Sequence, residues 1–129
     1  MSAEPRSVVL QAHRLNAAGV FSVVTCPPGI TLIAKTILVY FFGAGTCDVM
    51  VHTARNNGPP NAALLKKTMQ SGEVDFVNTW HVMMPADNIF ISTSVAGVDF
   101  WISGTSLRGV DTDYTPPPLP AVMPAAEWT

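Results

Sequence analysis

Three short runs of alternating apolar and polar residues, separated by turn signals, occupy the stretch from residue 72 to residue 107. Alternation with a period of two is the pattern of a β-strand that buries one face. Proline, glycine, asparagine and aspartate stand between the runs, where they favour chain reversal. This stretch therefore predicts antiparallel strands joined by tight turns, as in a β-sandwich or barrel.

The first and third runs indicate which residues share a face. In the first run one face carries Val74, Phe76, Trp80 and Val82, with Asn78 as a misfit, and the other carries Asp75, Thr79 and His81. In the third run Val98, Phe100 and Ile102 alternate with Asp99, Trp101 and Ser103. A half-buried strand packs its apolar face inward, so we expect both apolar faces in the core. Residues 89–94 supply the short strand between them.

Residues 31–42 form a run that is apolar on both faces. If such a run were exposed, it would leave a large apolar edge that is prone to association, so we expect a central strand. We expect Leu38 and Tyr40 on the opposite face of this strand from Val39 and Phe41. Further strands are expected at 8–15, 20–26, 47–53 and 62–69, the last favoured over a helical turn. The predicted fold class is all-β, a single antiparallel β-sandwich or jelly-roll-like domain over residues 8–110. Extended arms are expected at 1–7 and 111–129.

The C-terminal arm is rich in proline, with five prolines in residues 115–124. Proline has no amide proton to donate, so this segment predicts an extended polyproline conformation without ladder or helix. A backbone that is already restricted loses little entropy on docking, so we predict that the arm binds another subunit. The apolar contact residues of the arm would be Leu119, Val122, Met123 and Trp128.

The composition argues against several partners. Only 12% of the residues are charged and 48% are hydrophobic, which favours burial of surface in an assembly. Seven basic residues face nine acidic ones, and Lys66 with Lys67 is the one adjacent basic pair, so nucleic acid is not expected. No apolar run reaches the roughly 20 residues of a membrane span, and the polar start does not predict a signal peptide. We expect synthesis in a cytoplasm and no membrane partner.

No residue pattern points to catalysis, a metal or a cofactor. Cys26 and Cys47 lack the spacing of a metal site, and two buried thiols are favoured over a disulfide. His13, His52 and His81 lie on separate expected strands, where lone histidines are usually solvated or hydrogen-bonded. The acidic residues form no pair or calcium loop, and no nucleophile elbow is present. We therefore expect no enzymatic activity and no cofactor.

The segment that follows Gly72 and Glu73 carries a resemblance. A tryptophan-containing strand leads to a turn at Pro85, Ala86 and Asp87, and the chain continues as IFISTSVAGV (89–98) and FWISGTSL (100–107). This arrangement resembles small virion proteins of tailed bacteriophages, over residues 31–107, although those proteins usually have glycine in place of Ala86. The resemblance implies a non-enzymatic β-sandwich or jelly-roll-like domain of the virion, with its own copies and the major capsid protein as partners.

Two classes of function follow. The first is a bacteriophage structural protein, placed on the capsid as a decoration or cement protein, or alternatively in the tail or the head–tail junction. The second is a carbohydrate- or receptor-binding β module that uses Trp80 or Trp101 on an exposed face. Large aromatics in small β domains are more often core or interface anchors than sugar platforms. A binding module requires a ring in water beside polar side chains, whereas a cement protein buries its aromatic side chains in its core or in contacts, so we expect the exposure of the two tryptophans to discriminate between the classes.

Overall fold

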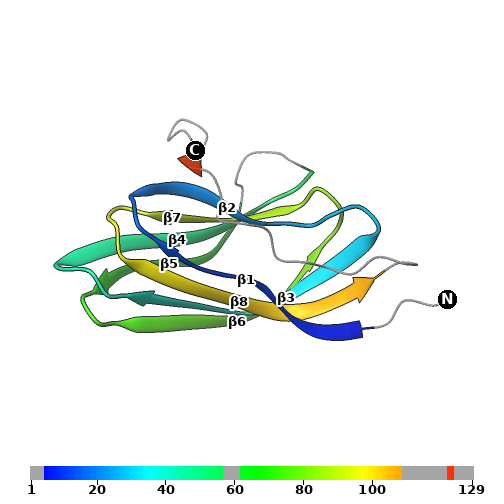
Figure 1. The fold of residues 1–129 in the computed structure, drawn as a ribbon, viewed down its shortest axis with the longest axis horizontal. Helices are drawn as coiled ribbons and strands as arrows, with labels where there is room; N and C mark the ends of the chain where they lie inside the picture. The colour runs from blue at the N-terminus through cyan, green and yellow to red at the C-terminus, as the bar shows by residue number, and fades with distance from the viewer. Residues whose placement is uncertain (1–4, 57–61, 109–121, 124–129) are drawn as a thin grey trace.

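The computed structural model describes residues 5–56, 62–108 and 122–123, and within these ranges all regular secondary structure is β-strand. The strands are β1 (Pro5–Leu15), β2 (Gly19–Thr25), β3 (Ile30–Phe41), β4 (Thr46–Ala54), β5 (Ala62–Gln70), β6 (Val74–Met83), β7 (Asn88–Thr93), β8 (Val98–Arg108) and β9 (Val122–Met123). Figure 1 shows them running along the long axis of the molecule. The predicted all-β class is confirmed.

The strands form a sandwich of two antiparallel sheets. One sheet has the order β1-β8-β3-β6, and the other has the order β5-β4-β7-β2, with β9 added beside β2. Strand β1 pairs with β8, β2 with β7, β3 with β6 and β4 with β5. This nested pairing arises when one long antiparallel hairpin is rolled up, and it is the pairing of an eight-stranded jelly roll. The predicted sandwich or jelly-roll-like domain is therefore confirmed.

Strand β3 is the central strand that its two-sided apolar run predicts. It lies between β8 and β6, and its residues Ile37, Val39 and Phe41 are fully buried between the sheets. Leu38 and Tyr40 lie on the opposite, outer face, as predicted, and Leu38 is 36% exposed. The other strands add to the same core mainly Leu10, Leu15, Phe21, Val23, Val49, Val51, Ile89, Ile91, Val98, Phe100 and Ile102.

The turns lie where the sequence predicts them, but most of them connect the two sheets. The turn after β6 leads to β7 in the other sheet, and the next turn leads back to β8. Among the described strands only β4 and β5 are consecutive in the chain and adjacent in one sheet. Ala86 has a φ of 74° and Gly97 a φ of 109°. This left-handed region favours glycine, so Ala86 adopts a backbone conformation that is unfavourable for a residue with a Cβ.

The expected orientation of β6 is wrong. Val74, Phe76 and Trp80 are 53%, 57% and 66% exposed, whereas the fully buried residue of this strand is Met83. The register with β3 explains the difference, because Leu38 pairs directly with Phe76 and directly paired residues share a face. Since Ile37 and Val39 occupy the core, Leu38 and the whole apolar side of β6 face outward. Asn78 belongs on this side, where its Oδ1 accepts a hydrogen bond from Thr36.

Within each expected arm, the described residues include a segment that pairs as a strand. Strand β1 begins at Pro5, three residues before the expected strand, and pairs from there with β8. The expectation that residues 115–124 form no ladder is wrong at Val122 and Met123, which pair with β2. These residues belong to the proline-free step between Pro120 and Pro124, so their amide protons are available. In the described part of the chain no helix has the length and apolar character needed to cross a membrane.

Candidate functional site

The outer side of the sheet β1-β8-β3-β6 carries an unusually apolar surface, which we call the aromatic face. It consists of Leu38, Phe42, Val74, Phe76, Trp80, Val82 and Trp101, which are between 36% and 66% exposed. Their combined exposed area is roughly 700 Å², given that a large aromatic side chain offers about 150–250 Å². The largest apolar patch of a typical monomer is about 300–600 Å². The aromatic face is therefore the leading candidate for a functional surface.

The centre of the aromatic face is a row of three side chains that crosses three strands. Leu38 of β3 pairs with Trp101 of β8 on one side and with Phe76 of β6 on the other. Leu38 is 36% exposed, while Trp101 is 49% and Phe76 is 57% exposed. The shorter side chain of Leu38 therefore lies lower than the two rings beside it. The row thus forms a shallow depression between two raised rings, and a partner surface can fit into it.

The charged groups beside this row are already partnered. The guanidinium of Arg14 is 2.7 Å from the carboxylate of Asp99 and stands over the ring of Phe42, 4.2 Å from its centroid. The hydrogen bond and the charge of Asp99 raise the pKa of Arg14 above its ordinary value. The ammonium of Lys35 lies 4.6 Å from the ring centroid of Trp80. These contacts hold both cations against rings of the face.

An open groove borders Trp101 where two strands bulge. Strand β1 is irregular between Val9 and Gln11, and β3 is irregular around Lys35. The groove encloses about 450 Å³ and is lined by Ser7, Val8, Val9, Lys35, Thr36, Trp101, Ser103 and Gly104. It combines one exposed ring with hydroxyl groups and an ammonium, which are the groups that hold polar small molecules.

The outer side of the other sheet is polar by comparison. A depression of about 360 Å³ there is lined by Asp48, Val49, Met50, Lys66, Lys67, Thr68 and Ser92. Asp48 accepts a hydrogen bond from the hydroxyl of Thr68 at 2.7 Å. Lys67 lies on the edge strand β5, and its ammonium forms ion pairs with Glu73 and with Asp75 of the edge strand β6. The two faces of the sandwich are therefore different in chemistry, and no strand of residues 5–56 and 62–108 covers the apolar one.

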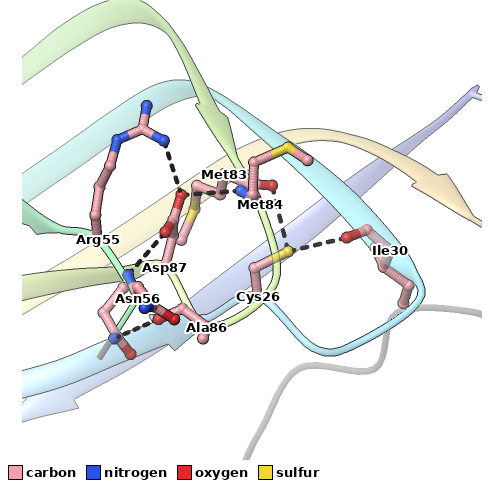
Figure 2. A network of polar contacts seen from close by, with 9 residues as sticks. Cys26, Ile30, Arg55, Asn56, Met83, Met84, Ala86 and Asp87 are labelled. Atoms are coloured by element: carbon pink, nitrogen blue, oxygen red, sulfur yellow. Dashed lines mark hydrogen bonds and ion pairs between the residues drawn. The ribbon is translucent and has the colours of Figure 1, made fainter. Parts of the chain in front are cut away.

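Asp87 is a buried carboxylate that ties together three connections, as Figure 2 shows. Its two oxygens accept hydrogen bonds from the backbone N–H groups of Asn56 and Met84, both at 3.0 Å, and Arg55 lies 3.8 Å away. The backbone of Asp87 also accepts a hydrogen bond from the N–H of Cys26 at 2.9 Å. Asp87 thus joins the ends of β2 and β4 to the turn after β6. This role is structural and was not predicted.

Replacement of Asp87 by alanine is expected to lower the free energy of unfolding by about 3 kcal/mol. The change removes two charge-assisted hydrogen bonds and leaves two backbone N–H groups without acceptors. Chemical denaturation would measure the loss. Asp48→Ala is the matched control, because Asp48 is exposed and its loss is expected to cost less than about 1 kcal/mol. Equal effects of the two changes would show that Asp87 does not hold these connections.

Both cysteines are free and buried, as the sequence predicts. The Sγ of Cys26 lies 3.2 Å from the carbonyl oxygen of Ile30 and 3.3 Å from that of Met83, as Figure 2 shows. Burial raises the pKa of the Cys26 thiol, so the thiolate is disfavoured. The Sγ of Cys47 lies 2.9 Å from the hydroxyl of Thr93. These thiols serve the packing of the core.

The three histidines do not come together. His13 lies on β1 and His81 on β6, at opposite edges of one sheet, and His52 lies on β4 in the other sheet. Burial lowers the pKa of His81 and of His52. Among residues 5–56 and 62–108 there is no group of three histidine, cysteine or acidic residues placed to hold a metal ion.

Docking of the C-terminal arm on another subunit stays a prediction. Of its four expected contact residues, Val122 and Met123 pair with β2 of their own chain. Leu119 and Trp128 lie outside the described residues. The aromatic face was not predicted from the sequence, because the apolar side of β6 was expected in the core, although the alternation in β6 correctly indicated which of its residues share a face.

Comparisons with known proteins give no family for this chain. No protein-family model matches it, and no curated protein matches it. Among solved structures, one of infectious bursal disease virus Gt strain aligns at 10% identity and a TM-score of 0.34, over 86% of this chain and 35% of that one. The Gx strain aligns at 13% identity with the same TM-score and coverage.

A third solved structure is the Clostridium thermocellum endo-1,4-β-D-xylanase 10B, comprising CBM22-1 and GH10 modules with xylohexaose. It aligns at 12% identity and a TM-score of 0.36, over 84% of this chain and 30% of that one. The present chain thus spans about a third of the length of each of these proteins. At such TM-scores the alignments carry no argument about function.

Proposed function

We propose that this chain is a structural subunit of a bacteriophage virion, placed on the capsid as a decoration or cement protein. We further propose that the aromatic face is the surface through which it joins the assembly. Trp80 and Trp101 are 66% and 49% exposed in the single chain. A binding module requires such exposure, and a surface that meets another subunit shows it as well before the contact forms. The single observation that carries the proposal is therefore the extent of the exposed apolar surface, which reaches beyond the two tryptophans to Phe76 and its aliphatic neighbours. Apolar side chains in water contribute about 25 cal/mol of unfavourable free energy for each Å², so a surface of this size gains substantially when a partner covers it.

The make-up of the aromatic face favours a protein partner. Leu38, Val74 and Val82 are aliphatic and stand among the rings of Phe76 and Trp80. Protein interfaces combine buried aromatic anchors with aliphatic surroundings and few charges at the centre. The cations near this face already contact rings or carboxylates, so a protein covering it need not supply a carboxylate for each of them.

The fold is compatible with this role without selecting it. Jelly rolls occur in viral capsid proteins, in lectins and in cupins, so the topology alone does not choose a function. The resemblance of residues 31–107 to phage virion proteins supports a role in a virus particle over the role of a lectin or a cupin. The low content of charged residues, 12% of the chain, supports an assembly for the same reason as the exposed face.

Retention of the chain on assembled particles tests the proposal. Phe76→Asp places a charge in the centre of the aromatic face and is expected to reduce the bound chain at least about 30-fold, the effect of losing an interface hot spot. Val95→Asp is the matched control, because Val95 is an exposed apolar residue in the turn between β7 and β8. Quantitative mass spectrometry of purified capsids and tails measures both. Equal retention of the two variants would contradict the proposal.

The same fractionation locates the chain in the virion. Recovery with capsids supports a decoration or cement protein, and recovery with tails selects the tail or head–tail junction instead. Absence of the wild-type chain from every particle fraction would reject a structural role in the virion.

The groove beside Trp101 supports a second candidate function, the binding of a carbohydrate. An exposed ring that stands beside the hydroxyl groups of Ser7, Thr36 and Ser103 is a suitable platform for a pyranose. This candidate predicts saccharide-dependent changes in tryptophan fluorescence that Trp101→Ala abolishes. Such changes, together with unaffected particle retention of Phe76→Asp, would select carbohydrate binding over assembly.

A further inference from the structure

The aromatic face can be covered either from its edge or from above. An edge contact would extend the sheet beyond β6, which is an edge strand. The start of that edge is already blocked: Asp75 accepts a hydrogen bond from the N–H of Phe76 at 2.8 Å, and Lys67 forms ion pairs with Asp75 and Glu73. Charged residues at an edge oppose the addition of a strand. These groups favour an occupant that lies on the face over one that extends the sheet from the start of β6.

The size of the aromatic face matches one half of a stable interface. Its seven side chains expose roughly 700 Å², and a standard interface buries about 800 Å² on each partner. Sheets that pack face to face stack about 10 Å apart, with interdigitated side chains and a small angle between the strands. A second flat, apolar sheet is therefore an occupant of suitable size and shape.

The charges of the face permit a second copy of the same chain. In a two-fold contact each group meets its own kind near the axis, so an uncompensated charge at the centre would repel its copy. The central row of Trp101, Leu38 and Phe76 carries no charge. At the rim Arg14 is paired with Asp99, and Lys35 lies over the ring of Trp80. The face is therefore compatible with itself.

We propose that two copies of this chain form a two-fold dimer by packing their aromatic faces against each other, with the axis near Leu38. At the axis the Leu38 side chains of the two copies face each other. The rings of Phe76 and Trp101 from both copies pack on the two sides of this leucine pair. This proposal rests on the proposed function in taking the aromatic face as the contact surface, and it names the partner. The dimer is the unit that would enter the assembly.

Sedimentation velocity of the full chain over a wide range of concentration tests the dimer. The wild-type chain and Val95→Asp are expected to dimerise alike. Phe76→Asp is expected to raise the dimer dissociation constant at least about 30-fold, because the two-fold axis places the changed residue in the contact twice. The thermal unfolding of monomeric Phe76→Asp shows whether the variant is folded. A wild-type chain that stays monomeric, or a dimer that Phe76→Asp leaves intact, would overturn the proposal.

Cross-linking at the axis provides a second measurement. Both native cysteines are buried, so Leu38→Cys introduces an exposed thiol at the centre of the face. Mild oxidation is expected to join two copies of Leu38→Cys through this residue, whereas Val95→Cys stays uncoupled. Equal coupling of the two variants would place the contact elsewhere.

The two proposals fail separately. If the chain is monomeric in solution while Phe76→Asp still abolishes retention on particles, the dimer is wrong and another virion protein covers the face. If the dimer forms through the aromatic face while Phe76→Asp is retained on particles like the wild type, the dimer stands and the proposed assembly role of the face is wrong.

Discussion

Replacement of Phe41 by alanine is expected to lower the free energy of unfolding by about 3–5 kcal/mol, the range for removing a buried aromatic ring. Phe41 is fully buried at the end of β3. Its ring lies so close to Gly43 that a Cβ added to that glycine would be 2.8 Å from the ring. Phe41 belongs to the main hydrophobic core, so removal of its ring leaves a cavity there. Chemical denaturation measures the loss.

Phe76→Ala is the control for this change, since it removes the same ring from the opposite face of the sheet. Phe76 is 57% exposed, and its replacement is expected to cost less than about 1 kcal/mol. The pair of variants tests the orientation of β6 directly. Similar losses for Phe41→Ala and Phe76→Ala, measured on monomeric protein, would place Phe76 in the core and remove the basis for the aromatic face.

Replacement of Gly104 by alanine is expected to lower the free energy of unfolding by about 3 kcal/mol or more, at the upper end of overpacking effects. A Cβ at this position would lie 1.9 Å from the carbonyl oxygen of Ile33 and 2.9 Å from its carbon. These atoms belong to the backbone of β3, next to its bulge, so they can move only if the pairing of β3 with β8 is disturbed. Thermal and chemical unfolding measure the effect.

Ser103→Ala is the matched control for Gly104→Ala. Ser103 is the preceding residue of β8 and lies half-buried on the outer face, so its change is expected to stay within about 0.5 kcal/mol. If Gly104→Ala unfolds like the wild type, the close approach of β3 and β8 at the bulge does not exist in solution. The groove beside Trp101 would then lose its structural basis, because Gly104 lines it.

Much of the local structure follows from the sequence. Alternation defined the strands, the turn formers defined the reversals, and the two-sided run identified β3 as central. The reason is that these features depend on short-range properties: which side chains share a face, and where the backbone can reverse. The buried state of Cys26 and Cys47 follows in the same way, since both adjoin apolar runs.

The candidate site required the tertiary structure. A period of two shows that Phe76 and Trp80 share a face, but it does not show which face of the sheet meets the core. That choice came from β3: Ile37 and Val39 fill the space between the sheets, so Leu38 and its partner Phe76 point outward. The turns likewise predicted reversal without indicating that β6, β7 and β8 alternate between sheets.

The same limit applies at the C-terminus and at Asp87. Composition indicated an extended chain after residue 115, yet the pairing of Val122 and Met123 depends on the edge of β2 being within reach. Asp87 looked like a turn residue, and only the fold brings the N–H groups of Asn56 and Met84 to its carboxylate. Alternation along one strand is a property of its own residues, whereas burial and partners depend on strands distant in the chain. The sequence by itself therefore determined the strands and turns, and the tertiary structure decided which surfaces remain available for binding.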